Sequence, residues 1–213
     1  MVDAPALAPA PRFLALGDSY TIGEGVEADE RWPAQLVRRL RALGIPIADA
    51  QIVAQTGWTT DELAAAMDAA TFAPPYAQVT LSIGVNNQYR GRALANYRDE
   101  FSELLKRARA LAGGSAQRVI VVSIPDWGVT RFAREQGRDS SRIAVDIDAF
   151  NGAACAIATA AGAAFVDVTA ISRDAGDGSA WLVADGLHPS AAQYALWSDE
   201  ILTAAMRVSS TPR

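Results

Sequence analysis

The sequence of 213 residues is short of the side chains that disulfide scaffolds and metal centres need. It has one cysteine, Cys155, and one histidine, His188. A single cysteine cannot form an intramolecular disulfide, and Cys155 lies in an alanine-rich stretch where a thiol serves as a small packing group. One histidine is too few for most metal sites built from nitrogen and oxygen ligands. We therefore predict no disulfide, no metal site and no cofactor.

Charge and hydropathy exclude other classes of protein. The chain has 19 Lys and Arg against 24 Asp and Glu, and it contains no dense basic run, so we expect no nucleic-acid partner. We find no apolar stretch that approaches the length of a membrane span, so we expect none. Half of the residues are hydrophobic and a fifth are charged, which is typical of a globular domain. The oligomeric state does not follow from these features.

The two ends of the chain differ from the rest in composition. Residues 1–12, MVDAPALAPAPR, hold three prolines and an early aspartate, which predicts an extended, flexible arm. This arm has neither the basic region nor the unbroken apolar region of a signal peptide. We expect a cytoplasmic protein as given, although a chain whose leader had been removed would look the same. Residues 13–208 are predicted to form a single domain, followed by a polar tail over 209–213.

Short apolar runs alternate with segments of helical periodicity along this domain. The predicted strands are Phe13–Leu16, Ile47–Val53, Gln78–Ile83, Arg118–Ile124 and Ala163–Val168. Helical stripes begin at Trp32, Leu63, Tyr97, Ile143 and Tyr194, and Thr59 with Glu62 forms a potential capping box before the second stripe. Most of the strands are nearly continuous in apolar residues, as strands covered on both faces are. The alternation predicts an α/β fold with a five-stranded parallel sheet between two layers of helices.

Polar and glycine residues follow the predicted strands, at the edge of a parallel sheet where ligands bind. The sequences there are Gly17-Asp18-Ser19, Gln55-Thr56-Gly57, Gly84-Val85-Asn86-Asn87, Pro125-Asp126-Trp127 and Asp185-Gly186-Leu187-His188. Acyl transfer needs a nucleophile, a base, an acid that orients the base, and donors for the oxyanion. Ser19, His188, Asp185 and Asn86 are of the right type, and each follows a predicted strand.

Each of these residues also has an ordinary structural interpretation. Ser19 can cap a helix, His188 can be a surface residue at a helix start, Asn86 can close an Asx turn, and Gly57 can be a loop glycine. The joint occurrence of all of them favours acyl transfer. A metal-dependent phosphoesterase is disfavoured by the single histidine, and an α/β-hydrolase by the lack of a second glycine in the Gly17–Thr21 sequence GDSYT.

Four motif blocks together resemble the GDSL or SGNH hydrolases, from about Leu14 to His188. They are GDS at 17–19, Gly57 after the second strand, GVN at 84–86 and DGLH at 185–188. The resemblance implies a flavodoxin-like, three-layer α/β/α sandwich. It implies Ser19 as the nucleophile, with Asp185 and His188 completing the triad. It also implies that the oxyanion hole consists of the Ser19 and Gly57 N–H groups and the Asn86 amide.

The sequence departs from the family pattern at two positions. Tyr20 stands where the family name has leucine, and we expect it to shape the pocket. In the family an aspartate often follows the asparagine of the third block, and here Asn87 replaces it. We expect this replacement to change the residues around the oxyanion donor rather than the donor itself. The remaining expected pocket residues are Trp58, Trp127, Phe132 and Trp181, each of which can instead anchor its loop.

We therefore predict a serine esterase that acts on small carboxylic esters, among them short acyl esters, thioesters or acetylated sugars. No long apolar surface segment indicates the lid of a lipase. An acyltransferase using the same site and a non-catalytic carbohydrate-binding module are the alternatives. The module has no need for these residues at the strand ends, and an acceptor alcohol distinguishes transfer from hydrolysis.

Overall fold

Five parallel strands form the sheet at the centre of this computed structural model, which describes residues 9–209. The strands are β1 (Phe13–Gly17), β2 (Ala50–Ala54), β3 (Gln78–Ser82), β4 (Val119–Val122) and β5 (Ala164–Val166). Their order across the sheet is β2-β1-β3-β4-β5, as in flavodoxin-like folds. Every residue of β1, β3 and β4 is buried, because helices cover both faces. The predicted fold class is confirmed.

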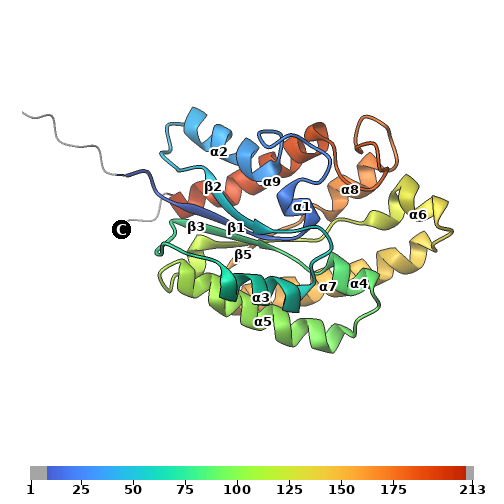
Figure 1. The fold of residues 1–213 in the computed structure, drawn as a ribbon, viewed down its shortest axis with the longest axis horizontal. Coiled ribbons are helices and arrows are strands. Elements are labelled where there is room, and N and C mark those ends of the chain that lie inside the picture. Colours follow the sequence, from blue (N-terminus) through green and yellow to red (C-terminus); the bar gives the residue numbers. More distant parts are fainter. Residues whose placement is uncertain (1–8, 210–213) are drawn as a thin grey trace, which may run out of the picture.

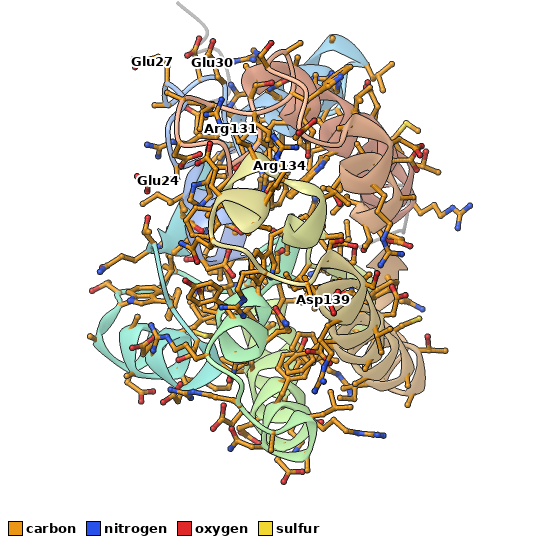
Figure 2. The ribbon with its side chains drawn as sticks, turned by 90° about the vertical axis from the view of Figure 1, so that its right-hand side faces the viewer. Glu24, Glu27, Glu30, Arg131, Arg134 and Asp139 are labelled. Atoms are coloured by element: carbon orange, nitrogen blue, oxygen red, sulfur yellow. The ribbon has the colours of Figure 1, made fainter. Side chains whose placement is uncertain are left out.

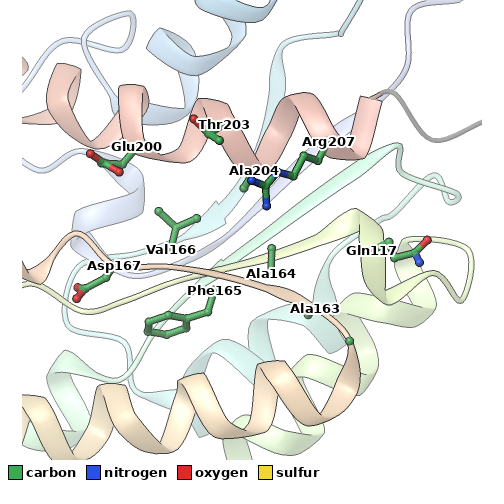
Figure 3. A pocket seen from close by; sticks show the side chains of 11 residues that line it. Gln117, Ala163, Ala164, Phe165, Val166, Asp167, Glu200, Thr203, Ala204 and Arg207 are labelled. Atoms are coloured by element: carbon green, nitrogen blue, oxygen red, sulfur yellow. The ribbon is translucent and has the colours of Figure 1, made fainter.

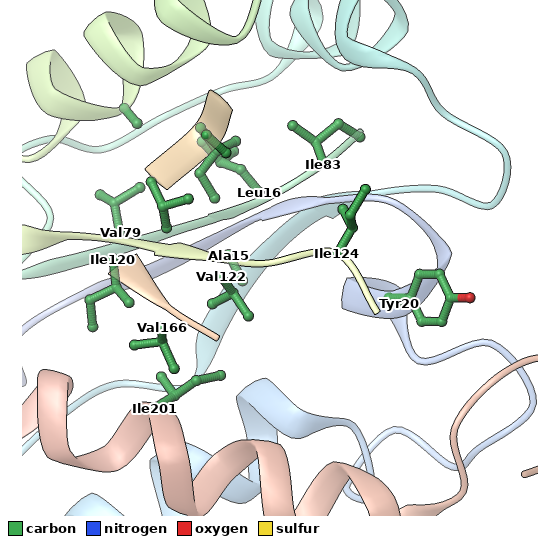
Figure 4. Close-up of a cluster of buried hydrophobic side chains, with 14 of the residues drawn as sticks. Ala15, Leu16, Tyr20, Val79, Ile83, Ile120, Val122, Ile124, Val166 and Ile201 are labelled. Atoms are coloured by element: carbon green, nitrogen blue, oxygen red, sulfur yellow. The ribbon is translucent and has the colours of Figure 1, made fainter. Parts of the chain in front are cut away.

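The longer helices make the two outer layers (Figure 1). On one face lie α2 (Trp32–Ala42), α8 (Thr169–Ala175) and α9 (Ala191–Ser209), and on the other lie α3 (Thr60–Ala69), α5 (Leu94–Leu111) and α7 (Ser140–Ala161). Their apolar stripes meet the sheet in one core, where Ile201 of α9 lies beside Val166 of β5 (Figure 4). A capping box begins α3: the Glu62 carboxylate accepts the Thr59 N–H at 2.8 Å, as predicted.

The second strand begins later than the sequence predicts. Ile47 is buried, yet the strand starts only at Ala50. The Ile47 carbonyl accepts a hydrogen bond from the Arg41 side chain, and the Ala48 N–H donates to the Pro11 carbonyl. These bonds hold residues 47 and 48 in an irregular connection between α2 and β2. Ile47 is therefore buried without being part of the strand.

The predicted N-terminal arm and C-terminal tail lie mostly outside the described residues, namely at 1–8 and 210–213. From Pro11 onward the chain is attached to the sheet, and the Arg12 carbonyl accepts the Ala77 N–H at 2.8 Å. The boundaries of the single predicted domain stay a prediction.

Judged by length and composition alone, α7 is apolar enough to cross a membrane, with a mean hydropathy of 1.3. The sequence analysis did not identify such a stretch. In the fold, α7 packs against α5 and the sheet, and its buried residues include Ile143, Ile147 and Phe150. These contacts are those of a helix that covers one face of the sheet.

Several very short helices, not predicted from the sequence, lie mainly at the carboxyl end of the sheet. They are α1 (Ser19–Ile22), α4 (Val85–Tyr89), α6 (Arg131–Glu135) and the 3₁₀ turn η2 (Trp127–Val129), while a second 3₁₀ turn, η1 (Ala116–Arg118), precedes β4. The chain leaves β1 toward β2 on one side and leaves β3 toward β4 on the other. This reversal opens a crevice between the loops after β1 and β3.

Candidate active site

The end of β1 presents Ser19 as the first residue of α1. Asp18, not Ser19, caps this helix, and its Oδ1 accepts the Tyr20 N–H at 3.1 Å. The interpretation of Ser19 as a helix cap is therefore wrong. Gly17 allows the sharp turn, because a Cβ there would lie 2.1 Å from the Thr21 hydroxyl oxygen. The serine is consequently held in a tight strand-to-helix turn.

The last block forms a closed turn around its own carboxylate. Asp185 Oδ1 accepts the N–H groups of Leu187 and His188, at 2.8 and 3.0 Å, and Oδ2 lies 2.6 Å from His188 Nδ1. The imidazole is 7% exposed and packs against the Tyr20 ring, with 5.3 Å between ring centroids. The three-residue spacing thus brings the Asp185 carboxylate within hydrogen-bond distance of the His188 ring, as the sequence predicts.

This contact determines which ring nitrogen carries the proton. An ionised carboxylate only accepts hydrogen bonds, so Nδ1 donates and Nε2 keeps its lone pair. Burial alone would raise the pKa of Asp185, but the hydrogen bonds from the His188 ring and backbone and from the Leu187 N–H outweigh it, and the pKa is lowered. Asp185 therefore stays ionised and holds His188 in the tautomer that can accept a proton.

A neighbouring helix braces this turn. Arg131 of α6 donates to the Ala184 carbonyl at 2.8 Å, and the Phe132 N–H donates to the Gly186 carbonyl at 3.0 Å. Gly186 has φ +69°, a conformation that favours glycine. A Cβ there would lie 2.7 Å from Nε of the flexible Arg131 side chain, which would have to move. Figure 2 looks onto this end of the molecule, with Arg131 and Arg134 on α6 and Glu24 across from them.

A cavity of about 180 Å³ brings the motif blocks together. Its lining residues come from the loops after β1, β2, β3 and β4 and from the last block: Ser19, Tyr20, Thr56, Gly57, Val85, Asn86, Tyr89, Trp127, Phe132, Leu187 and His188. Ser19 and His188, which are 169 positions apart in the chain, share this wall. The predicted pocket residues Tyr20, Trp127 and Phe132 also lie there.

The second and third blocks are joined by a side-chain hydrogen bond. Asn86 Nδ2 donates to the Trp58 carbonyl at 2.9 Å, which uses one of its two N–H groups and leaves the other. Gly57 has φ +86°, a conformation that favours glycine. The Ser19 N–H, at the first position of α1, has no acceptor within that helix. Three N–H donors therefore belong to residues that line the same cavity.

The profile of the GDSL-like Lipase/Acylhydrolase family matches residues 15–196, which is most of the chain. The chain belongs to this family. No curated protein sequence matches it. As a member, the protein is a carboxylic ester hydrolase of the GDSL type, and the resemblance inferred from the four blocks is confirmed.

Solved structures at low sequence identity include three proteins with the same fold. TesA aligns with a TM-score of 0.73 and 21% identity, over 92% of this chain and 99% of TesA. The psychrotrophic esterase EstA from Pseudoalteromonas sp. aligns with a TM-score of 0.71 and 18% identity, over 92% and 97%. A mutant of Axe2, an acetyl-xylooligosaccharide esterase from Geobacillus Stearmophilus, has a TM-score of 0.69 and 19% identity, over 96% of both chains. At these identities the likeness shows the fold.

Three predicted pocket residues of this GDSL hydrolase are not in the cavity wall. Asn87 is fully buried and bonds Thr60 twice, accepting its N–H at 3.1 Å and donating to its hydroxyl at 2.7 Å. Trp58 is half-buried against the core. Trp181 lies in the turn before the last block, where its carbonyl accepts the Ser190 N–H at 2.8 Å. Their surroundings are those of residues that anchor their loops, so the structure does not bring them into the pocket.

Other residues in the wall were missed by the sequence analysis. Tyr89 is 39% exposed and packs edge-on against Trp127, with 5.3 Å between ring centroids. It stands three residues after Asn86, so predicting a helix after the third block would have placed both side chains on one face. Leu187 lies between Asp185 and His188, and its position beside the predicted base was the one signal that it lines the pocket. No pattern in the sequence predicts that Val85 and Thr56 line the pocket.

A larger hollow of about 800 Å³ lies elsewhere, along the free edge of β5 (Figure 3). It is lined by Asp167 after this strand, by Gln117, and by Glu200 and Arg207 of α9, among others. None of the four motif blocks reaches it. The smaller cavity is the candidate active site because it holds the reactive groups. Within residues 9–209, no three His, Cys, Asp or Glu side chains gather in a way that could hold a metal ion.

Asp18 gives the stability of the protein an expected pH dependence. It is 1% exposed, its Oδ2 has no hydrogen-bond partner among the described residues, and burial raises its pKa from 3.8 to about 7. The folded protein keeps this proton up to about pH 7, whereas the unfolded chain releases it near pH 3.8. The stabilisation is therefore complete below pH 3.8 and is lost as the pH rises to about 7.

Replacement Asp18→Asn tests this expectation, because asparagine is also a good helix cap but does not ionise. Between pH 5 and 7 the free energy of unfolding of the wild type should fall relative to that of the variant, by up to about 1.4 kcal/mol per pH unit. Urea denaturation at several pH values measures both. If the free energies of unfolding of the two proteins changed equally with pH, the expectation would be contradicted.

Proposed function

We propose that this GDSL hydrolase is a serine esterase for small carboxylic esters that works through an acyl-enzyme. The observation that carries the proposal is the shared cavity: Ser19, the Nδ1-anchored imidazole of His188, and the N–H donors of Gly57 and Asn86 all line it. These groups supply the nucleophile, the base and the oxyanion donors that acyl transfer requires.

The proposed reaction follows from the roles of these groups. His188 Nε2 takes the proton of Ser19 Oγ while this oxygen attacks the ester carbonyl carbon. The developing oxyanion accepts hydrogen bonds from the N–H groups of Ser19 and Gly57 and from Asn86 Nδ2. The imidazolium then protonates the leaving alcohol, which leaves an acyl-Ser19 ester. Water, deprotonated by His188, releases the acid by the reverse sequence.

The dimensions of the cavity support a short acyl group. Its volume of about 180 Å³ is below the roughly 300–1,000 Å³ that is usual for drug-sized ligands. Val85, Trp127, Phe132 and Leu187 make much of its wall apolar, and Trp127 is held by a 2.8 Å hydrogen bond from its Nε1 to Gln88 Oε1. Axe2, which shares the fold, is an acetyl-xylooligosaccharide esterase, and an acetyl group agrees with this size.

A series of p-nitrophenyl esters of increasing acyl length tests the substrate class. We expect kcat/KM to be highest for acetyl and butyryl esters and to fall for longer chains, which the cavity cannot enclose. A maximum at long chains would refute the short-acyl proposal. Analysis of the products in the presence of an added alcohol separates hydrolysis from acyl transfer: a predominant new ester would favour the acyltransferase alternative.

Replacement Asn86→Ala tests the proposed oxyanion donor. Loss of the amide should lower kcat by about 10²–10³, with a small change in KM, because the donor acts mainly in the transition state. Steady-state kinetics on p-nitrophenyl acetate measure the effect. Asn96→Ala, at an exposed position of α5 where the amide bonds Glu100, is the matched control and should leave kcat unchanged. Equal kcat in both variants would remove Asn86 from the mechanism.

A further inference from the structure

The turn that carries Gly57 is held from outside by an arginine of the following block. Arg90 follows α4, and its Nη2 donates to the Gly57 carbonyl at 2.6 Å. Its Nη1 lies 3.2 Å from Glu62 Oε1. Arg90 is not among the residues that line the cavity, so it acts on the site only through the groups that it holds.

Glu62 ties this arginine to a rigid part of the fold. While Oε1 faces Arg90, Oε2 accepts the Thr59 N–H at 2.8 Å and its hydroxyl at 2.9 Å, in the box that caps α3. The Gly57 carbonyl is therefore linked through one guanidinium to the first turn of α3. A guanidinium is suited to this, because its planar fork can serve two acceptors at once.

The oxyanion donor of Gly57 needs such a constraint. The Trp58 N–H bonds the Gln55 carbonyl at 3.3 Å, which closes a turn with Gly57 at its third position and φ +86°. The Gly57 N–H belongs to the central peptide of this turn. Glycine restricts its own backbone angles less than any other residue, so contacts outside the turn are needed to fix where this N–H lies.

The two hydrogen bonds from α4 and the residue after it act on consecutive carbonyls of the turn. Arg90 holds the carbonyl of Gly57, and Asn86 Nδ2 holds that of Trp58. Both carbonyls belong to the backbone that follows the Gly57 N–H, so the two contacts fix the position of Gly57 and of the peptides after it. The contacts therefore oppose a shift of the turn that would move the Gly57 N–H away from the oxyanion.

We propose that Arg90 is a positioning residue that keeps the Gly57 N–H oriented as an oxyanion donor. This inference rests on the proposed function and adds a residue that no motif block contains. A donor that is already oriented costs no reorganisation in the transition state, and a misplacement of about 1 Å can cost about 10²-fold in rate. Without Arg90 the substrate should still bind, but the oxyanion should be stabilised less.

The test compares Arg90→Met with Arg92→Met. Arg92 is a close match, because it also reaches the first turn of α3, with its Nη1 2.6 Å from Asp61 Oδ1, but no contact joins it to Gly57 in the described hydrogen bonds. We expect Arg90→Met to lower kcat on p-nitrophenyl acetate by about 10- to 100-fold, with KM changed less than about threefold. The rate of Ser19 labelling by a fluorophosphonate should fall in parallel, and Arg92→Met should resemble the wild type.

Two further measurements separate orientation from general loss of structure. Added guanidinium ion, below denaturing concentrations, should restore part of kcat in Arg90→Met and none in Arg92→Met. Arg90→Lys, which keeps the charge but cannot span both acceptors in the same way, should lie between wild type and Arg90→Met.

Equal kcat in the two methionine variants, or a loss confined to KM, would overturn the assignment of Arg90. If Ser19→Ala were still inactive in that case, the esterase proposal would stand without it. Full activity of Ser19→Ala would instead refute the proposed function itself.

Discussion

Replacement of Ser19 by alanine should abolish hydrolysis, with kcat lowered by about 10⁶. Ser19 Oγ is the one group of the cavity that we expect to bond the acyl carbon, and no acyl-enzyme forms without it. The turn itself should survive, because Asp18 supplies the helix cap through its own carboxylate. Kinetics on p-nitrophenyl acetate and covalent labelling by a fluorophosphonate probe measure the loss independently.

Ser102→Ala is the matched control for this experiment. Ser102 lies on α5, its hydroxyl donates to the Arg98 carbonyl at 2.7 Å, and it is not part of the cavity. This variant should label and turn over like the wild type. Labelling of Ser19→Ala at the wild-type rate would show that another residue is the nucleophile, and would refute the mechanism.

Replacement of His188 by alanine should have an effect of similar size, since the nucleophile and its base act as a unit. Ser19 then keeps its proton, and neither attack nor release of the alcohol is assisted. The measurement is again kcat on p-nitrophenyl acetate, together with the pH profile of kcat/KM.

The chain has no second histidine to serve as a matched control, so rescue takes its place. Imidazole added to His188→Ala should restore part of the turnover, because the ring leaves a space beside Tyr20 and Asp185. Added imidazole should do nothing for Ser19→Ala. Turnover of His188→Ala at the wild-type rate is incompatible with the proposed base.

Much of the fold could be predicted because its signals are local and repeated. Apolar runs such as Val119–Val122 are buried on both faces, and stripes such as that of α5 recur every turn. The start of β2 was mispredicted, since burial of Ile47 does not reveal that its carbonyl bonds Arg41 rather than a strand. The short helices α1, α4 and α6 were not predicted, because four or five residues are too few to show a period.

The pocket was predictable only in part. Trp127 and Phe132 line the cavity, whereas Trp58 and Trp181, which are also aromatic and lie nearer to a motif block in the sequence, do not. The difference lies in the direction in which each loop turns its side chain. That direction depends on contacts with residues far away in the chain.

By itself the sequence determined the α/β alternation, the family, and the residue types for acyl-transfer chemistry. Asp185 could be assigned to His188 because three residues in a tight turn leave little freedom. Only the tertiary structure decided that Ser19 and His188 share one cavity, that Asn86 faces it while Asn87 bonds Thr60, and that Arg90 holds Gly57. Such contacts join segments far apart in the chain, and their geometry is set by how the helices pack on the sheet.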